Sequence, residues 1–184
     1  LFGQGFDLEM APTRIQALIM FLRVLGEEDA ALAYTGPALP FTDIQPGSNS
    51  AKYVGYAYAK GYTTGVEPTR FGSSTPVSTA QFLTLLLRAL GYEDGKDFTW
   101  STPWTLTDQL GITDGDYTAQ TATFLRADAA VVSANALYAP KKGEDKTLLQ
   151  DLLDSGAISG STVVIWDYAP LLFDEDFASF LFYP

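Results

Sequence analysis

The chain has 184 residues, no cysteine and no histidine, and its 22 acidic against 11 basic residues give a net charge of −11. The missing residue types exclude disulfides, thiolate metal sites and histidine-based acid–base chemistry. Nucleic acid is a poor partner for so acidic a chain, because affinity for it comes largely from phosphate neutralisation by Lys and Arg. No apolar run approaches the ~18 residues of a membrane span. We therefore expect no membrane span, no metal and no cofactor.

The first predicted element is an amphipathic helix between Thr13 and Gly26. Thr13 is a good N-cap, and Gln16 three residues later completes a capping box. Gly26 stands where a left-handed C-cap is expected. The apolar residues that recur at helical spacing are Ile15, Leu18, Ile19, Leu22 and Leu25.

A second long helix repeats this pattern from Ser78 to Gly91. Ser78 and Gln81 form its capping box, and both helices end in Leu-Arg-x-Leu-Gly. The arginines of that ending, Arg23 and Arg88, lie where cations favour a helix C-terminus. A structural role is therefore predicted for both arginines.

A glycine turn precedes the long helices. Gly61-Tyr62-Thr63-Thr64-Gly65 matches Gly111-Ile112-Thr113-Asp114-Gly115, and Leu1-Phe2-Gly3-Gln4-Gly5 is similar to both. Glycines four residues apart suit a helix C-cap followed by a tight turn. Shorter helices are predicted ahead of the two complete turns, at Ala51–Lys60 and Trp104–Leu110. The chain thus repeats a unit of short helix, turn and long helix.

The third long helix is expected to begin near Leu125-Arg126-Ala127-Asp128 and to run through Leu137. Leu125 offers the backbone no side-chain acceptor, which leaves Thr123 as an earlier cap. The last segment belongs to no repeat: Val163–Trp166 reads as a short strand, and apolar residues follow it. We predict a mainly α fold with a small irregular or β C-terminal segment. The predicted division is 1–39, 40–95, 96–139 and 140–184.

The second repeat carries a family resemblance. It contains, in order, Phe41-Thr42-Asp43-Ile44, Tyr53-Val54-Gly55-Tyr56-Ala57-Tyr58, Gly61-Tyr62-Thr63-Thr64-Gly65, Phe71-Gly72 and Val77-Ser78-Thr79-Ala80-Gln81-Phe82. These segments resemble one S-layer homology repeat. Pro12-Thr13-Arg14-Ile15-Gln16 resembles the Thr-Arg-Ala-Glu helix start of that family, and Phe124-Leu125-Arg126-Ala127-Asp128 resembles a divergent version. The resemblance covers roughly residues 1–137, and 137–158 looks like the helical tail that follows such triplets.

The resemblance implies three pseudo-symmetric repeats whose grooves hold a secondary cell-wall polysaccharide, often with a pyruvylated terminal sugar. Binding in the family uses the Arg of the helix start, with an Asp and a Trp from the short-helix region. Carried over, this predicts glycan contacts from the three helix starts and one loop: Thr13, Arg14, Gln16, Asp43, Ser78, Gln81, Arg126 and Asp128. A guanidinium fork can hold a carboxylate through two parallel hydrogen bonds.

This sequence departs from the family pattern in three places. Thr79 stands where the second repeat would carry its Arg, Ser50 stands near the expected Trp, and Trp100 stands where the third repeat would carry its Asp. The resemblance therefore implies at most two equipped grooves.

Several alternatives remain open on sequence alone. Arg14 fits an anion ligand and equally a solvated helix-start residue. The tyrosines near Tyr53 fit sugar stacking, but core packing is favoured. Asp174-Glu175-Asp176 reads as a solvated cluster rather than a calcium loop or a catalytic pair. The preferred hypothesis is a secreted, non-catalytic module at the cell wall whose partner is an anionic wall polysaccharide. Its alternative is a scaffold for surface-layer or other protein assembly that has lost glycan binding.

Overall fold

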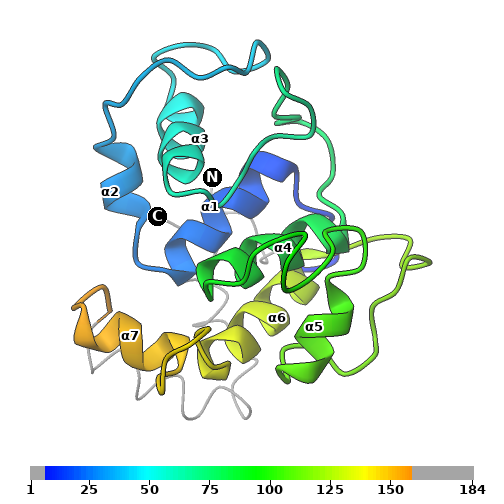
Figure 1. Ribbon diagram of the computed structural model, residues 1–184. Helices are drawn as coiled ribbons and strands as arrows, with labels where there is room; N and C mark the ends of the chain where they lie inside the picture. Colours follow the sequence, from blue (N-terminus) through cyan, green and yellow to red (C-terminus); the bar gives the residue numbers. More distant parts are fainter. Residues whose placement is uncertain (1–6, 159–184) are drawn as a thin grey trace.

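The computed structural model describes residues 7–158 and is mainly helical, as predicted (Figure 1). Its helices are α1 (Arg14–Val24), α2 (Glu28–Leu32), α3 (Asn49–Ala59), α4 (Thr79–Ala89), α5 (Trp104–Gln109), α6 (Arg126–Tyr138) and α7 (Leu148–Asp154). Within the described part of the chain, β pairing is limited to isolated bridges. The predicted strand at Val163–Trp166 and the apolar tail lie outside the described residues. No described helix is long and apolar enough to cross a membrane.

The three long helices α1, α4 and α6 pack against one another in pairs at the centre of the molecule (Figure 1). Their facing sides supply much of the core, which includes Leu18, Phe21, Leu22, Phe82, Leu86, Leu90, Val132 and Leu137. The other helices cover this centre: α2 and α3 pack on α1, α5 packs on α4, and α7 packs on α6. Each of the three central helices is therefore covered by the helix or helices that follow it in the chain.

Capping residues fix where the long helices begin. Thr13 and Ser78 form the predicted capping boxes with Gln16 and Gln81. In α6 only half of the box exists, because Leu125 cannot accept a hydrogen bond and the Asp128 carboxylate alone accepts the Leu125 N–H at 2.7 Å. The alternative start at Thr123 is wrong.

Backbone carbonyls from a distant segment complete two of these helix starts. At α1, the N–H groups of Arg14 and Ile15 donate to the carbonyls of Thr75 (2.8 Å) and Ser73 (3.2 Å). At α6, the first two N–H groups donate to the carbonyls of Met10 and Leu8, both at 3.0 Å. These bonds satisfy donors that a helix cannot satisfy by itself.

One expectation about the elements needs correction. The helix predicted at Ala51–Lys60 is not short: Ser48 caps it, so α3 begins at Asn49 and has the same 11 residues as α1 and α4. Within the predicted helical tail, α6 ends at Tyr138 before Pro140 and α7 starts anew behind the Thr147 cap. The expected left-handed glycines are present, with φ of +77° at Gly61 and +84° at Gly65.

Candidate functional site: a groove lined by two arginines

A polar cavity of about 380 Å³ lies where the start of α1, the glycine turn of the second repeat, α4 and the loop before α5 meet. Segments far apart in the sequence therefore supply its walls. The residues that line it include Arg14, Thr63, Gln81, Arg88, Asp94 and Trp100. We call this cavity the arginine groove.

Arg14 is held in place by local and distant contacts. It is the first residue of α1, directly after the Thr13 cap, so its position follows from the capping box. Its guanidinium carbon lies 5.1 Å from the ring centroid of Phe71, and Nη2 donates a 3.3 Å hydrogen bond to the Thr63 hydroxyl. The ring and the hydroxyl orient the guanidinium without neutralising it.

The charge of Arg14 has no carboxylate counterpart among residues 7–158, where no acidic oxygen lies within 4.0 Å of its nitrogens. Its Nε is buried and makes no hydrogen bond within this part of the chain. Burial, and then the positive charge of Arg88, lower the pKa of Arg14 to about 10. A half-buried cation without a counterion is costly to the fold, so an anion bound at this position would stabilise it.

Arg88 supplies the second cation of the groove. It lies in the last turn of α4, and its Nη1 donates a 2.9 Å hydrogen bond to the Tyr62 carbonyl. Burial lowers its pKa, while the nearby Asp94 carboxylate opposes that change. The sequence-equivalent Arg23 behaves differently, because it forms a two-pronged ion pair with Glu28 at 2.8 and 3.0 Å. The structural role predicted for this position is thus confirmed at Arg23, whereas Arg88 faces the groove.

Trp100 gives the groove an exposed apolar surface. Its side chain is 59% exposed, and its backbone N–H donates to Asp94 Oδ1 at 2.8 Å. The flat apolar face of an exposed tryptophan can stack against a sugar ring, while its indole N–H stays in contact with water. Gln81 also lines the groove, although its carbonyl oxygen accepts the Ser78 N–H at 3.2 Å.

Only two of the eight predicted glycan contacts, Arg14 and Gln81, lie in this groove. Thr13, Gln16 and Ser78 serve as helix caps. The structure does not bring the remaining three predicted residues to the same place.

Asp43 has both carboxylate oxygens engaged, by the N–H groups of Phe71 (2.8 Å) and Gly72 (2.7 Å). Burial opposes ionisation, but these and further backbone donors outweigh it and hold the pKa of Asp43 below its ordinary value. Asp43 therefore fixes the loop that places the Phe71 ring against the Arg14 guanidinium, so it supports the groove without lining it.

Arg126 and Asp128 take part in contacts at the start of α6. Nη1 of Arg126 lies 3.7 Å from an oxygen of Asp7, and the Asp128 carboxylate accepts from the Tyr117 hydroxyl at 3.0 Å as well as from Leu125. At the corresponding position of α4, Thr79 is 5% exposed and its buried hydroxyl has no partner within the described residues. Of the three long helices, α1 alone combines a helix-start arginine with the groove.

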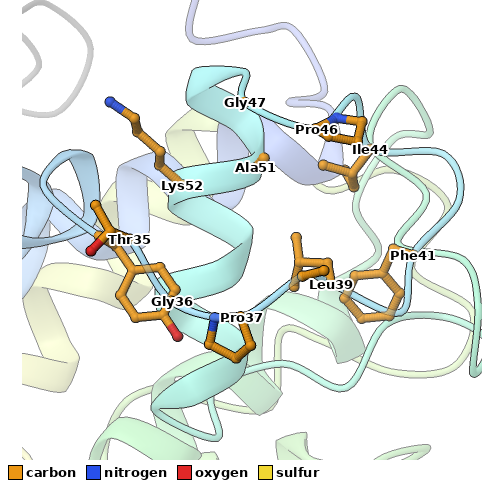
Figure 2. Close-up of a pocket in the computed structure, with 12 residues that line it drawn as sticks. Thr35, Gly36, Pro37, Leu39, Phe41, Ile44, Pro46, Gly47, Ala51 and Lys52 are labelled. Carbon is orange, nitrogen blue, oxygen red and sulfur yellow. The ribbon is translucent and has the colours of Figure 1, made fainter.

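A second cavity, of about 290 Å³, lies beside α3 and differs in character. Its lining is mostly apolar and includes Tyr34, Pro37, Leu39, Phe41, Ile44 and Pro46. Figure 2 shows Leu39 and Phe41 side by side in it, while the Lys52 side chain extends away from them.

Among the tyrosines predicted to favour the core, Tyr53 is buried and donates to Glu28 at 2.8 Å. The described residues contain no group of three or more potential metal ligands.

The chain is similar to a "Cell surface protein" of Thermoanaerobacter kivui, with 29% identity over 136 residues. That match covers 73% of this chain but 18% of the relative, so the chain spans less than a fifth of that protein. No family model matches the chain, and no solved structure matches it. The similarity fits a role at the cell surface.

Proposed function

We propose that this chain is a non-catalytic anchoring module of the S-layer homology type that binds an anionic cell-wall glycan in the arginine groove. One observation carries the proposal: Arg14 is half-buried, has no carboxylate partner within residues 7–158 and shares its groove with Arg88. A carboxylate of the glycan, such as a pyruvyl group, would neutralise both guanidiniums and satisfy Nε of Arg14.

The surroundings of the arginine pair suit a sugar. The Gln81 side chain and the turn backbone offer polar partners for hydroxyl groups, and Trp100 offers a stacking face. The net charge of −11 opposes the approach of an acidic polymer. That repulsion is screened over ~8 Å at physiological salt, so the arginines dominate at contact distance.

The packing also supports the family proposal. The helices α1, α4 and α6 meet pairwise, and each is covered by at least one further helix, as three related repeats would require. The repeat boundaries at 39/40, 95/96 and 139/140 stay a prediction from the sequence.

A pull-down on purified cell-wall sacculi tests the proposal, with one sample kept intact and another stripped of secondary polysaccharide. We expect binding to the intact sample only. Arg14→Ala should weaken binding about tenfold or more, because a charged hydrogen-bonding group contributes roughly 1.5–3 kcal/mol. Arg70→Ala is the matched control: it removes the same charge from an exposed side chain that pairs with Glu67. Equal binding by the Arg14 variant and the control would overturn the proposal, and release of free sugars would overturn its non-catalytic part.

A second candidate function is a scaffold for surface-layer or other protein assembly. The apolar cavity beside α3 favours it, because apolar hollows of this kind accept side chains of another protein. Under this alternative the protein would not bind sacculi, and it would self-associate at micromolar concentration in sedimentation experiments. Pro37→Asp, at an exposed edge of the cavity, would then abolish self-association, whereas Arg14→Ala would leave it intact.

A further inference from the structure

The arginine groove adjoins another cavity at Arg88. This neighbouring cavity, of about 420 Å³, shares Arg88 and Asp94 with the groove and is otherwise bounded by Gly61, Gly91, Tyr92 and Glu93. A ligand longer than one sugar unit that fills the groove can therefore continue past Arg88. We call the two cavities together the channel.

The sign of the charge changes along the channel. Arg14 lines only the inner cavity, Arg88 and Asp94 line both cavities, and Glu93 lines only the outer one. Glu93 is paired with Lys96 at 2.9 Å, which neutralises the outer rim. The inner end is thus cationic, and Asp94 marks the place where the positive character ends.

The charges behind the outer rim are also balanced. Asp97 accepts from Lys142 at 2.5 Å, and Lys142 lies 3.7 Å from Glu93. The outer region therefore holds three carboxylates, Asp94 included, against three cations: the ammonium groups of Lys96 and Lys142 and the guanidinium of Arg88. No excess cation remains among the described residues there to receive a second anionic group.

Asp94 itself makes no ion pair within the described residues. One oxygen, Oδ1, accepts the Trp100 N–H at 2.8 Å, and Oδ2 makes no hydrogen bond in this part of the chain. Asp94 is exposed and stays beside Arg88, whose pKa it raises against the effect of burial. It therefore positions Trp100 with one oxygen and presents the other to the channel.

We infer that Asp94 makes the channel directional: the anionic unit of a glycan occupies the Arg14 end, and the next unit, beside Asp94, is uncharged or carries an amine. This inference rests on the proposed function. A carboxylate beside Asp94 meets a like charge, whereas a hydroxyl or an ammonium group donates to Oδ2. The channel accepts a chain whose acid is confined to its end and disfavours a chain with an acid on every unit, so part of its specificity comes from repulsion.

Two matched disaccharides test the inference by isothermal titration calorimetry on the full chain. One is digalacturonic acid with both carboxylates free, and the other is the same disaccharide with the reducing-end carboxylate methyl-esterified. We expect the half-ester to bind about three- to tenfold more tightly, which is the effect of one like-charge pair a few ångströms apart near the surface. In Asp94→Asn the amide oxygen can still accept the Trp100 N–H, and the preference should fall below about twofold.

Asp114→Asn is the control, since it removes an exposed carboxylate that does not line the channel, and it should keep the wild-type preference. Equal affinity for the two disaccharides in the wild type, or a preference that survives Asp94→Asn, would overturn the directional inference and leave anion binding intact. If neither disaccharide binds to the wild type, the anionic-glycan proposal fails together with the inference.

Discussion

Replacing Arg14 by methionine removes a charge that the fold keeps partly away from water. Burial, and to a smaller extent the charge of Arg88, lower the pKa of Arg14 from its ordinary value to about 10. At about 1.36 kcal/mol for each unit of pKa, the charged side chain destabilises the folded state by roughly 3 kcal/mol. The unfolded chain binds the proton more tightly, so this penalty is present at every pH below about 10 and is relieved as the pH rises above that value.

The substitution also removes favourable contacts. The interaction with the Phe71 ring contributes about 0.5–1 kcal/mol and the hydrogen bond to Thr63 about 1 kcal/mol. Methionine keeps most of the packing volume. We therefore expect Arg14→Met to raise the free energy of unfolding by about 1 kcal/mol at pH 7, or roughly 2–4 °C in Tm, while glycan binding is lost.

Equilibrium unfolding in urea, followed by circular dichroism, measures this change. Arg70→Met is the matched control and should stay within about 0.5 kcal/mol of the wild type, since Arg70 is exposed and its pair with Glu67 lies at the surface. A loss of about 1 kcal/mol or more in Arg14→Met, with the control unchanged, would refute the reasoning. It would mean that Arg14 is a well-satisfied structural residue and that its groove stores no unfavourable charge.

Three further predictions concern the fold around the groove. Gly65→Ala should lower the free energy of unfolding in urea by more than about 2 kcal/mol, because a Cβ would lie 2.5 Å from the Phe41 ring and within 3 Å of two carbonyl oxygens. The control Gly111→Ala has a similar φ but open space around the Cβ, and it should lower that free energy by only about 1 kcal/mol. Asp43→Ala should lower the free energy of unfolding by about 2–3 kcal/mol and weaken glycan binding, since two buried backbone donors lose their acceptor. A variant as stable as the wild type would contradict the role given to these two hydrogen bonds. Burial raises the pKa of Tyr53 to about 12, so its contribution to stability, complete below pH 10, should disappear between pH 10 and 12; Tyr53→Phe should flatten that part of the pH–stability curve.

The helix starts were predictable because capping is local. Thr13 with Gln16, and Ser78 with Gln81, satisfy donors within one turn, and no distant residue is needed to identify them. Arg14 could be singled out because it follows such a cap. Its lack of a counterion within residues 7–158 could not be predicted, since that depends on the Phe71 loop and on α4.

Arg88 shows the limit of sequence reasoning most directly. Both Arg23 and Arg88 are followed five residues later by a glutamate, so the local patterns are equivalent. Glu28 forms an ion pair with Arg23, whereas Glu93 forms an ion pair with Lys96 and lies near Lys142. Lys96, three residues after Glu93, and Lys142, far along the chain, thus help to decide which arginine is left for the groove, and only the first of them is a local signal.

Asp43 was predicted as a sugar contact because its position resembles a binding residue of the family. In the structure its two oxygens are occupied by backbone donors, which only the pairing of the Phe41 and Phe71 loops creates. On sequence, Trp100 is a departure from the family pattern, and its exposure depends on the loop that Asp94 closes. The role of a residue was therefore predictable where its partner is near in sequence, and unpredictable where packing brings a distant partner to it.

The hydrogen bonds that complete the starts of α1 and α6 limit how this protein can be divided. The first N–H groups of α1 are satisfied by Ser73 and Thr75, and those of α6 by Leu8 and Met10. A fragment cut at residue 39 or residue 95 would leave these donors facing solvent and would strip covering helices from the long ones. Fragments that hold one predicted repeat are therefore unsuitable as independent tags or building blocks, and a fusion that keeps these helix starts intact needs residues 7–158 as one piece.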